Sequence, residues 1–138
     1  MKLLAGVKGT GKTKSLIAEV NKVCGESHGS IVFIEKGKKL TFDVSYHARL
    51  VDTEEYGIAG AEQLYGYLCG ILSANYDITE VFIDNVFAIC NKSVEELETF
   101  LVKAKEITSK NNVEIMVSAS VDPSALSETV RADRKSVV

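Results

Sequence analysis

Several features that would place the chain outside an ordinary globular class are missing from its sequence. No apolar run approaches the length of a membrane span, and residues 1–5 are too short for a signal peptide. The net charge is −3, so the chain has no overall positive field to attract nucleic acid or an anionic membrane. No repeat, low-complexity segment or linker divides the 138 residues. These absences predict one cytoplasmic domain with no membrane partner.

Cysteine and histidine are scarce and scattered. The three cysteines, Cys24, Cys69 and Cys90, are odd in number and lie among apolar residues. This pattern favours small core residues in a reducing compartment over a disulfide framework or a metal site. His28 and His47 stand alone, without the spacing of metal ligands. The remaining composition, 46% apolar and 25% charged, is typical of a globular domain.

The most informative stretch is residues 6–13, Gly-Val-Lys-Gly-Thr-Gly-Lys-Thr, which match the pattern G-x-x-x-x-G-K-[ST] at every required position. An apolar run at 3–5 precedes it, and a helical pattern of apolar residues follows over 16–23. Glycines accept positive φ and have no Cβ to block a phosphate, so the loop can point successive N–H groups inward. A helix beginning near Gly11 would add its positive dipole end. The motif therefore predicts binding of nucleotide phosphates, the alternative being a glycine-rich turn that binds nothing.

The expected contacts with the nucleotide and magnesium come from the motif and from the end of the expected strand at 80–85. Lys12 would reach the β- and γ-phosphates, and the Thr13 hydroxyl would ligate Mg²⁺. Asp84 closes an apolar strand, as a Walker B aspartate does, and can hold the same magnesium ion; the alternative is an aspartate that caps a turn. The residues expected to bind the nucleotide are Gly6, Lys8, Gly9, Thr10, Gly11, Lys12, Thr13, Lys14 and Ser118, and those expected to bind magnesium are Thr13 and Asp84.

The rest of the chain alternates expected strands and helices. Strands are expected at 3–5, 31–34, 80–85 and 113–117. Helices are expected over 11–24, from Ala61 onward and over 94–110. Loops are expected at 26–30, 35–39 and 53–60. Residues 40–44 and 48–51 are less distinct and could form a hairpin or an edge strand. Residues 93–96 have the form of a capping box, and Asp122-Pro123 looks like the start of a short terminal helix.

Strands that alternate with helices imply right-handed βαβ units. We therefore expect an α/β fold with three layers, α/β/α, and a mainly parallel sheet, made by residues 1–122 with a short helix or tail at 123–138. Ligands of such sheets bind at the carboxyl ends of the strands. Glu35, Asp84 and Ser118 all follow expected strands, so they should face the edge where the motif lies.

Residues 2–120 resemble the RecA-like branch of the P-loop ATPases. The resemblance rests on the motif at 6–13 and on Asp84-Asn85, since that branch often follows its Walker B aspartate with a small polar residue. It implies a P-loop NTPase fold and magnesium-dependent hydrolysis of ATP to ADP and phosphate. Lys12 and Asp84 would be catalytic, and Glu35, at the end of the strand after the motif's helix, would be the general base unless it is an ordinary solvated glutamate.

Three further expectations follow from single positions. The resemblance implies that a polar residue at Ser118 or Ser120 senses the γ-phosphate. Asn85 has no basic carboxylate, so it can orient a water molecule but cannot take its proton. This keeps open a binding protein that holds ATP or GTP without turnover. No N-K-x-D guanine motif occurs, because the run that begins at Asn91 lacks the aspartate, so ATP is preferred over GTP.

Basic residues bear on the remaining alternatives. Arginine occurs only as Arg49, Arg131 and Arg134, and no lid is inserted between Asn85 and Pro123, which argues against a nucleoside or nucleotide kinase. Arg131 or Arg134 could act in trans within a homo-oligomer or larger assembly, but a solvated, partly disordered tail is the simpler interpretation. The lysines at 36, 38 and 39 could meet phosphates or nucleic acid at the ligand edge, but such a run is usually a solvated loop. No aromatic residues interleave with them, so nucleic acid is not an expected partner.

Overall fold

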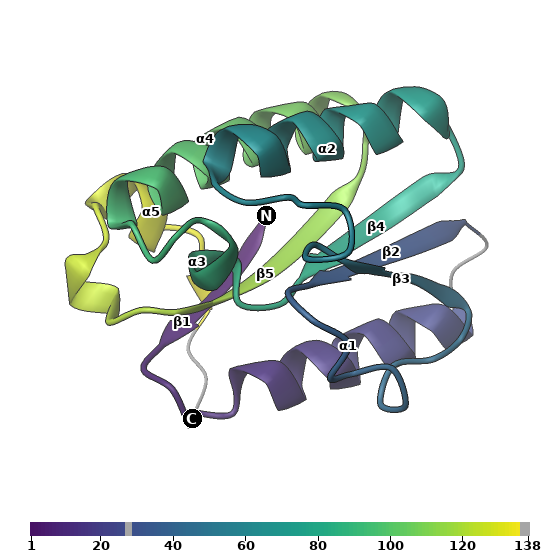
Figure 1. Ribbon diagram of the computed structural model, residues 1–138, viewed down its shortest axis with the longest axis horizontal. Helices are drawn as coiled ribbons and strands as arrows, with labels where there is room; N and C mark the ends of the chain where they lie inside the picture. The colour runs from purple at the N-terminus through teal and green to yellow at the C-terminus, as the bar shows by residue number, and fades with distance from the viewer. Residues whose placement is uncertain (27–28, 136–138) are drawn as a thin grey trace.

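Within residues 1–26 and 29–135, which the computed structural model describes, six strands form one parallel sheet (Figure 1). The strands are β1 (Lys2–Gly6), β2 (Ser30–Glu35), β3 (Ala48–Asp52), β4 (Ile78–Ile83), β5 (Glu114–Ser120) and β6 (Arg134–Lys135). Their order across the sheet is β3-β2-β4-β5-β1-β6, and every neighbouring pair is parallel. Two of the residues in the expected loop at 26–30, Ser27 and His28, lie outside the described residues.

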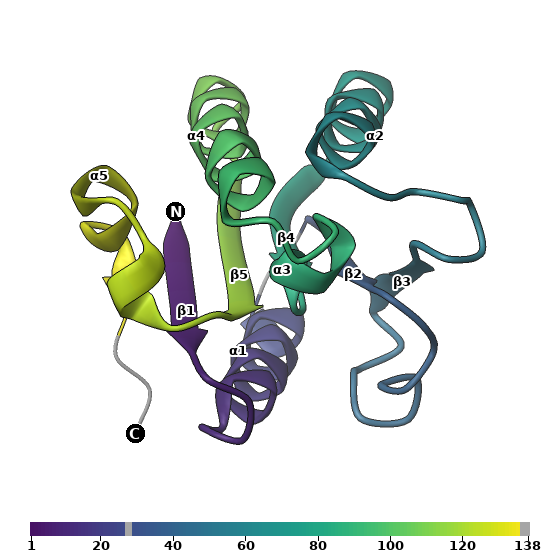
Figure 2. The ribbon, with the colours of Figure 1, turned by 60° about the vertical axis from the view of Figure 1, so that its left-hand side comes forward.

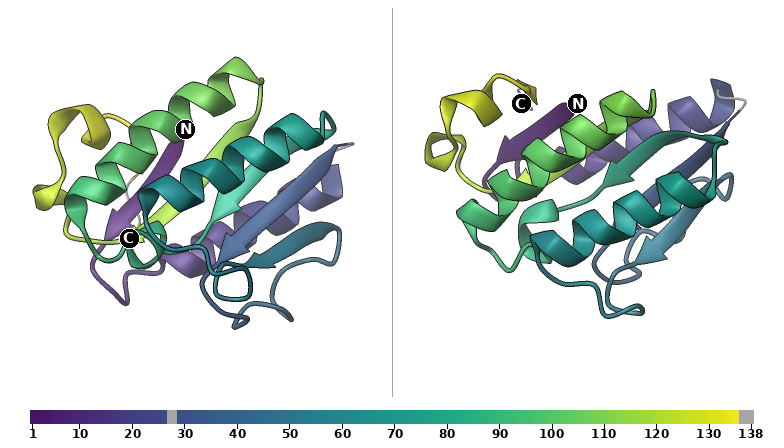
Figure 3. Two further views of the ribbon diagram at one scale, coloured as in Figure 1. Left: turned by 45° about the horizontal axis from the view of Figure 1, so that its top comes forward. Right: turned by 90° about the horizontal axis from the view of Figure 1, so that it is seen from above.

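Helices cover both faces of the sheet. Helix α1 (Lys12–Glu26) lies on one face, and α2 (Ala61–Ala74) and α4 (Val94–Lys110) lie side by side on the other (Figures 2 and 3). The short helices are α3 (Val86–Ile89) and α5 (Glu128–Arg131), with a 3₁₀ turn, η1 (Pro123–Ala125), before α5. The expected α/β fold with a parallel sheet is confirmed.

The two faces of the sheet carry separate apolar clusters, because successive strand residues point to opposite faces. Leu4 and Phe33 pack with Leu16 and Val20 of α1 on one face. Residues of alternate strand positions pack against α2 and α4 on the other face, with Leu64 and other helix side chains fully buried. Strands covered on both sides need an apolar residue at nearly every position, which is why the runs at 31–34 and 81–83 are continuous.

The segment before β3 differs from the expectation. Residues 40–44 form turns, not a strand, and β3 runs parallel to β2, so the hairpin is wrong and the edge strand is confirmed. Val44 is buried under α1. Asn21 of α1 fixes this segment, because its side chain donates to Asp43 O at 2.9 Å and accepts from Ser45 N at 2.8 Å. These contacts with a helix distant in sequence override the local alternation.

Part of the C-terminal segment is a strand, where a solvated, partly disordered tail was expected. Arg134 and Lys135 form β6, which pairs with Leu3 and Leu4 of β1. Leu3 N donates to Asp133 O at 3.0 Å. A β1 without this partner would expose its backbone groups along one side of the sheet, so pairing favours order here. Residues 136–138 of the expected tail lie outside the described residues.

The expected capping box forms only in part. Ser93 caps α4 by accepting a hydrogen bond from Glu96 N at 3.2 Å. The Glu96 carboxylate does not return to Ser93 but accepts from Ala61 N, at the start of α2, at 3.1 Å. Its other oxygen accepts from Asn91 Nδ2 at 3.3 Å. Glu96 thus joins the first turns of α2 and α4 to the turn that follows α3.

The structure bears on the cysteines and on membrane-spanning helices. All three cysteines are free thiols; Cys90 is buried, whereas Cys24 and Cys69 are half-buried. In the described part of the chain, no helix combines the length and the apolar character needed to cross a membrane.

Candidate functional site

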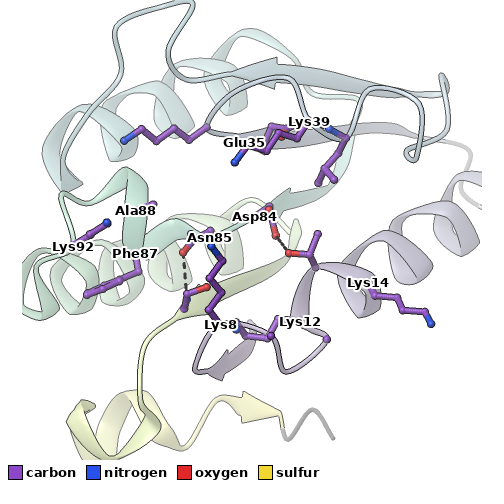
Figure 4. Close-up of a pocket in the computed structure, with 16 residues that line it drawn as sticks. Lys8, Lys12, Lys14, Glu35, Lys39, Asp84, Asn85, Phe87, Ala88 and Lys92 are labelled. Atoms are coloured by element: carbon purple, nitrogen blue, oxygen red, sulfur yellow. Dashed lines mark hydrogen bonds between the residues drawn. The ribbon is translucent and has the colours of Figure 1, made fainter.

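A cleft of about 660 Å³ lies past the carboxyl ends of the central strands (Figure 4). The chain leaves β1 toward α1 on one face and leaves β4 toward α3 and α4 on the other, and such a divergence opens a crevice at the sheet edge. The cleft is lined by Lys8, Gly9, Gly11, Lys12, Thr13, Lys14, Glu35, Lys36, Lys39, Leu40, Asp84, Asn85, Phe87, Ala88, Lys92 and Ser120.

The loop between β1 and α1 forms one wall of the cleft. Gly9 and Gly11 have φ of 91° and 87°, a region that residues with a Cβ rarely occupy. At Gly6 an added Cβ would lie 2.9 Å from Thr10 Oγ1, so the tight curl also excludes a side chain there. Thr10 Oγ1 donates to Val7 O at 3.0 Å and closes the loop. The glycines of the motif are therefore explained by backbone geometry.

Lys12 is the buried cation of this wall, with only 5% of its surface exposed. Its Nζ donates to Val7 O at 2.8 Å and to Thr10 Oγ1 at 3.2 Å. Burial lowers the pKa of the Lys12 ammonium, and the charge of Asp84 acts in the opposite direction. Both hydrogen-bond acceptors are neutral, so an anionic oxygen would be a stronger partner for this ammonium.

Asp84 connects the loop wall to the central strands. Its Oδ1 accepts from Thr13 Oγ1 at 3.1 Å and from Ser118 Oγ at 2.9 Å. Ser118 Oγ also accepts from Asn85 N at 2.7 Å. Thr13 and Asp84 are 71 positions apart, so the fold is what brings the two expected magnesium ligands together.

Asn85 adopts the left-handed conformation, with φ 46° and ψ 59°. Its Oδ1 accepts from Ser120 N at 3.3 Å, which directs this amide oxygen toward β5. Asparagine tolerates this conformation better than most residues, because its short side chain can bond locally. The turn starts α3 and brings Phe87 and Ala88 to the cleft.

Thr13 and Asp84 are the described groups best suited to hold a divalent cation. Across residues 1–26 and 29–135 no cluster of three or more histidine, cysteine or acidic side chains could hold a metal ion by itself. Magnesium commonly takes one or two protein oxygens and completes its shell with phosphate oxygens and water. The hydroxyl and carboxylate at this position fit that arrangement.

Glu35 lies on the opposite side of the cleft from the loop and is only 4% exposed. Its Oε2 accepts from Leu40 N at 3.2 Å. Burial raises the pKa of the Glu35 carboxyl; the N–H groups of Leu40 and Lys39 oppose this, whereas the charges of Asp84 and Asp52 add to it. A carboxyl with a raised pKa is a suitable proton acceptor.

The structure brings most of the expected site residues into this one cleft. Those expected to bind or react that do not line it are Gly6, Thr10 and Ser118. Ser118 is buried, and its hydroxyl is engaged by Asp84 and Asn85. Sequence reasoning missed Phe87, Ala88 and Lys92, because the apolar run at 86–90 is too short for its pattern to distinguish a helix from a strand. No arginine is among the described residues that line the cleft.

Replacing Glu35 by glutamine is expected to stabilise the protein at neutral pH. The raised pKa means that the folded state holds this proton more tightly than the unfolded chain does. The associated stability is present below the unfolded pKa, about 4.3, and is lost as the pH rises through the folded value. Glu35→Gln should therefore raise the urea midpoint at pH 7 and lose this advantage on acidification. Exposed Glu55→Gln serves as the control, and an advantage for Glu35→Gln that does not change with pH would contradict the prediction.

Comparisons with known proteins add no identification. A scan against models of protein families finds no match to this chain, and a search of curated proteins finds none either. Function must therefore be argued from the site.

Proposed function

We propose that this chain is a magnesium-dependent ATP-binding protein with the P-loop NTPase fold, similar to the RecA-like ATPases, and that it hydrolyses ATP to ADP and phosphate. The observation that carries the proposal is the hydrogen bond between Thr13 of the loop and Asp84 at the end of β4. Lys12 and Glu35 line the same cleft. A turn that bound nothing would not require this convergence of a buried cation and two carboxylates.

Each residue of the site would have its own role. The N–H groups of the loop and Lys12 would bind the phosphates, and Thr13 and Asp84 would hold magnesium. Bound magnesium would neutralise charge on the phosphate oxygens. Glu35 would accept the proton of a water molecule that attacks the γ-phosphate, because Asn85 has no group basic enough to do so. Ser118 would keep Asp84 and the Asn85 turn in position through its two hydrogen bonds.

A nucleotide-binding switch without turnover is the second candidate. It is favoured by the absence of arginine from the described lining of the cleft. An arginine finger can raise phosphoryl-transfer rates by about 10³–10⁵, so a site without one is expected to be slow unless a partner supplies it. In either case the nucleotide binds the same residues.

The test is calorimetric titration of the wild-type protein with ATP and with GTP, with and without magnesium, and with phosphate release measured in the same samples. Magnesium-dependent ATP binding with slow phosphate release would support the ATPase. Binding without release would favour the switch. If neither nucleotide binds, the proposal fails.

A further inference from the structure

Three lysines that do not belong to the loop or to α1 line the cleft. Lys36 and Lys39 come from the connection between β2 and β3, and Lys92 follows α3. Figure 4 labels Lys39 and Lys92. With Lys8, Lys12 and Lys14, six of the residues that line the cleft are lysines and two, Glu35 and Asp84, are acidic. We call Lys36, Lys39 and Lys92 the lysine wall.

Lys92 reaches the cleft through an unfavourable backbone conformation. Asn91 and Lys92 have φ of 60° and 54°, and lysine rarely adopts such values. The turn is held by Lys92 N donating to Phe87 O at 2.9 Å and by Asn91 donating to Glu96. Strained residues persist where the surrounding structure enforces them, and they cluster at ligand sites. Glycine would adopt this backbone conformation with less strain than lysine. What lysine adds at position 92 is its ammonium group.

The charges of the lysine wall are not used by the protein itself. Within the described residues, no carboxylate forms an ion pair with Lys36, Lys39 or Lys92, whereas Lys38 of the same segment pairs with Glu55 at 3.6 Å. Lys38 lines a different, smaller pocket. All three side chains are exposed at the surface of the cleft, so each ammonium group is accessible to an anion from solution.

The triphosphate of a nucleotide does not account for these charges. It would be bound by the loop, Lys12 and magnesium, which together neutralise it. Figure 4 shows Lys39 beside Glu35, beyond Asp84 as seen from the loop, and Lys92 beside Phe87 and Ala88 at the α3 end of the cleft. These two half-buried apolar side chains offer a surface for an uncharged part of a ligand.

We propose that the lysine wall binds a second ligand, a phosphorylated small molecule, while the nucleotide occupies the loop. This inference rests on the proposed function, since it assigns the nucleotide to the loop wall. The phosphate would be bound between Lys36, Lys39 and Lys92, and the rest of the molecule would contact Phe87 and Ala88.

The probe is inorganic pyrophosphate, titrated by calorimetry into protein saturated with excess magnesium and a non-hydrolysable ATP analogue. Saturation prevents pyrophosphate from binding to the loop. We expect pyrophosphate to bind this complex, and the triple variant Lys36→Ala, Lys39→Ala, Lys92→Ala to weaken binding at least about tenfold. The matched control, Lys38→Ala, should leave pyrophosphate affinity unchanged, and all variants should bind the ATP analogue with similar affinity.

Lys92→Asn separates ligand binding from folding. Asparagine is favoured over lysine at positive φ, so this variant should unfold at the same temperature as wild type or higher. It should nevertheless bind pyrophosphate more weakly. A merely structural role for Lys92 would make stability fall and leave pyrophosphate affinity unchanged, which would overturn the assignment.

The remaining outcomes are also decisive. Pyrophosphate that binds the nucleotide-free protein but not the analogue complex would show that it uses only the loop, and the inference would fail while the proposed function stood. If the analogue itself does not bind, the proposed function fails instead. Single-stranded oligonucleotide that binds the complex through the same lysines, in place of pyrophosphate, would overturn the small-molecule assignment in favour of nucleic acid.

Discussion

Replacing Lys12 by methionine is expected to weaken ATP binding by about 10- to 100-fold. A hydrogen bond from a charged donor contributes about 1.5–3 kcal/mol, and each 1.4 kcal/mol is tenfold in affinity. Lys12 is buried and bonded only to the neutral oxygens of Val7 and Thr10, so it would form its first charged contact with the nucleotide. Calorimetric titration of both proteins with magnesium and ATP measures the difference.

Methionine is chosen because it keeps most of the unbranched apolar stem that packs at this buried position. The variant should therefore fold as the wild type does, which circular dichroism and urea denaturation would establish. Lys22→Ala is the matched control, since Lys22 is an exposed lysine of the same helix that does not line the cleft. Equal ATP affinity for wild type and Lys12→Met would show that the loop does not bind the phosphates.

Replacing Glu35 by glutamine is expected to lower the rate of ATP hydrolysis by about 100-fold or more, with little change in ATP affinity. General bases contribute roughly 10²–10⁴ to a rate, and glutamine keeps the shape and the acceptor for Leu40 N without the basic carboxylate. The measurement is phosphate release at saturating ATP, with affinity determined separately. Glu55→Gln, which changes an exposed carboxylate outside the cleft, should keep the wild-type rate.

The pH profile of hydrolysis adds an independent test of Glu35. A base must be deprotonated, and the raised pKa means that Glu35 gains its proton at a higher pH than an ordinary glutamate. The wild-type rate should therefore fall on mild acidification, before other carboxylates titrate, and the residual rate of Glu35→Gln should lack this fall. A wild-type rate retained after Glu35→Gln would assign the proton transfer to another group.

The parts of the fold predicted from sequence are those set by local pattern. The loop and the start of α1 were predicted from the motif at 6–13. A loop that curls this tightly needs glycines at fixed positions, independently of the rest of the chain. Strands β2 and β4 were recognised from the continuous apolar runs at 31–34 and 81–83, which burial on both faces requires. Since the strands are parallel, Glu35 and Asp84 had to lie at one edge, and the structure brings both into one cleft.

The parts that were missed depend on contacts between distant segments. Residues 40–44 alternate as a strand does, but Asn21 and the burial of Val44 under α1 hold them in turns. Helix α3 follows a left-handed Asn85 whose conformation is supported by Ser118 and Ser120 of β5. No pattern of neighbouring residues encodes such contacts. Lys92 was missed for the same reason, because only the fold brings it to the cleft that Lys36 and Lys39 also line.

The shortness of β6 has a consequence for self-association. Its two residues, Arg134–Lys135, pair with Leu3 and Leu4 and are the only strand beside β1 on that side within the described residues. A chain that ended at Asp133 would keep the bond from Leu3 N to Asp133 O but would otherwise turn β1 into an edge strand, in a stretch whose only charged residue is Lys2. Such an edge can pair with a strand of another molecule. Because β1 leads directly into the glycine loop, aggregation through this edge would distort the loop wall of the cleft, so colloidal stability and the proposed nucleotide affinity should be lost together.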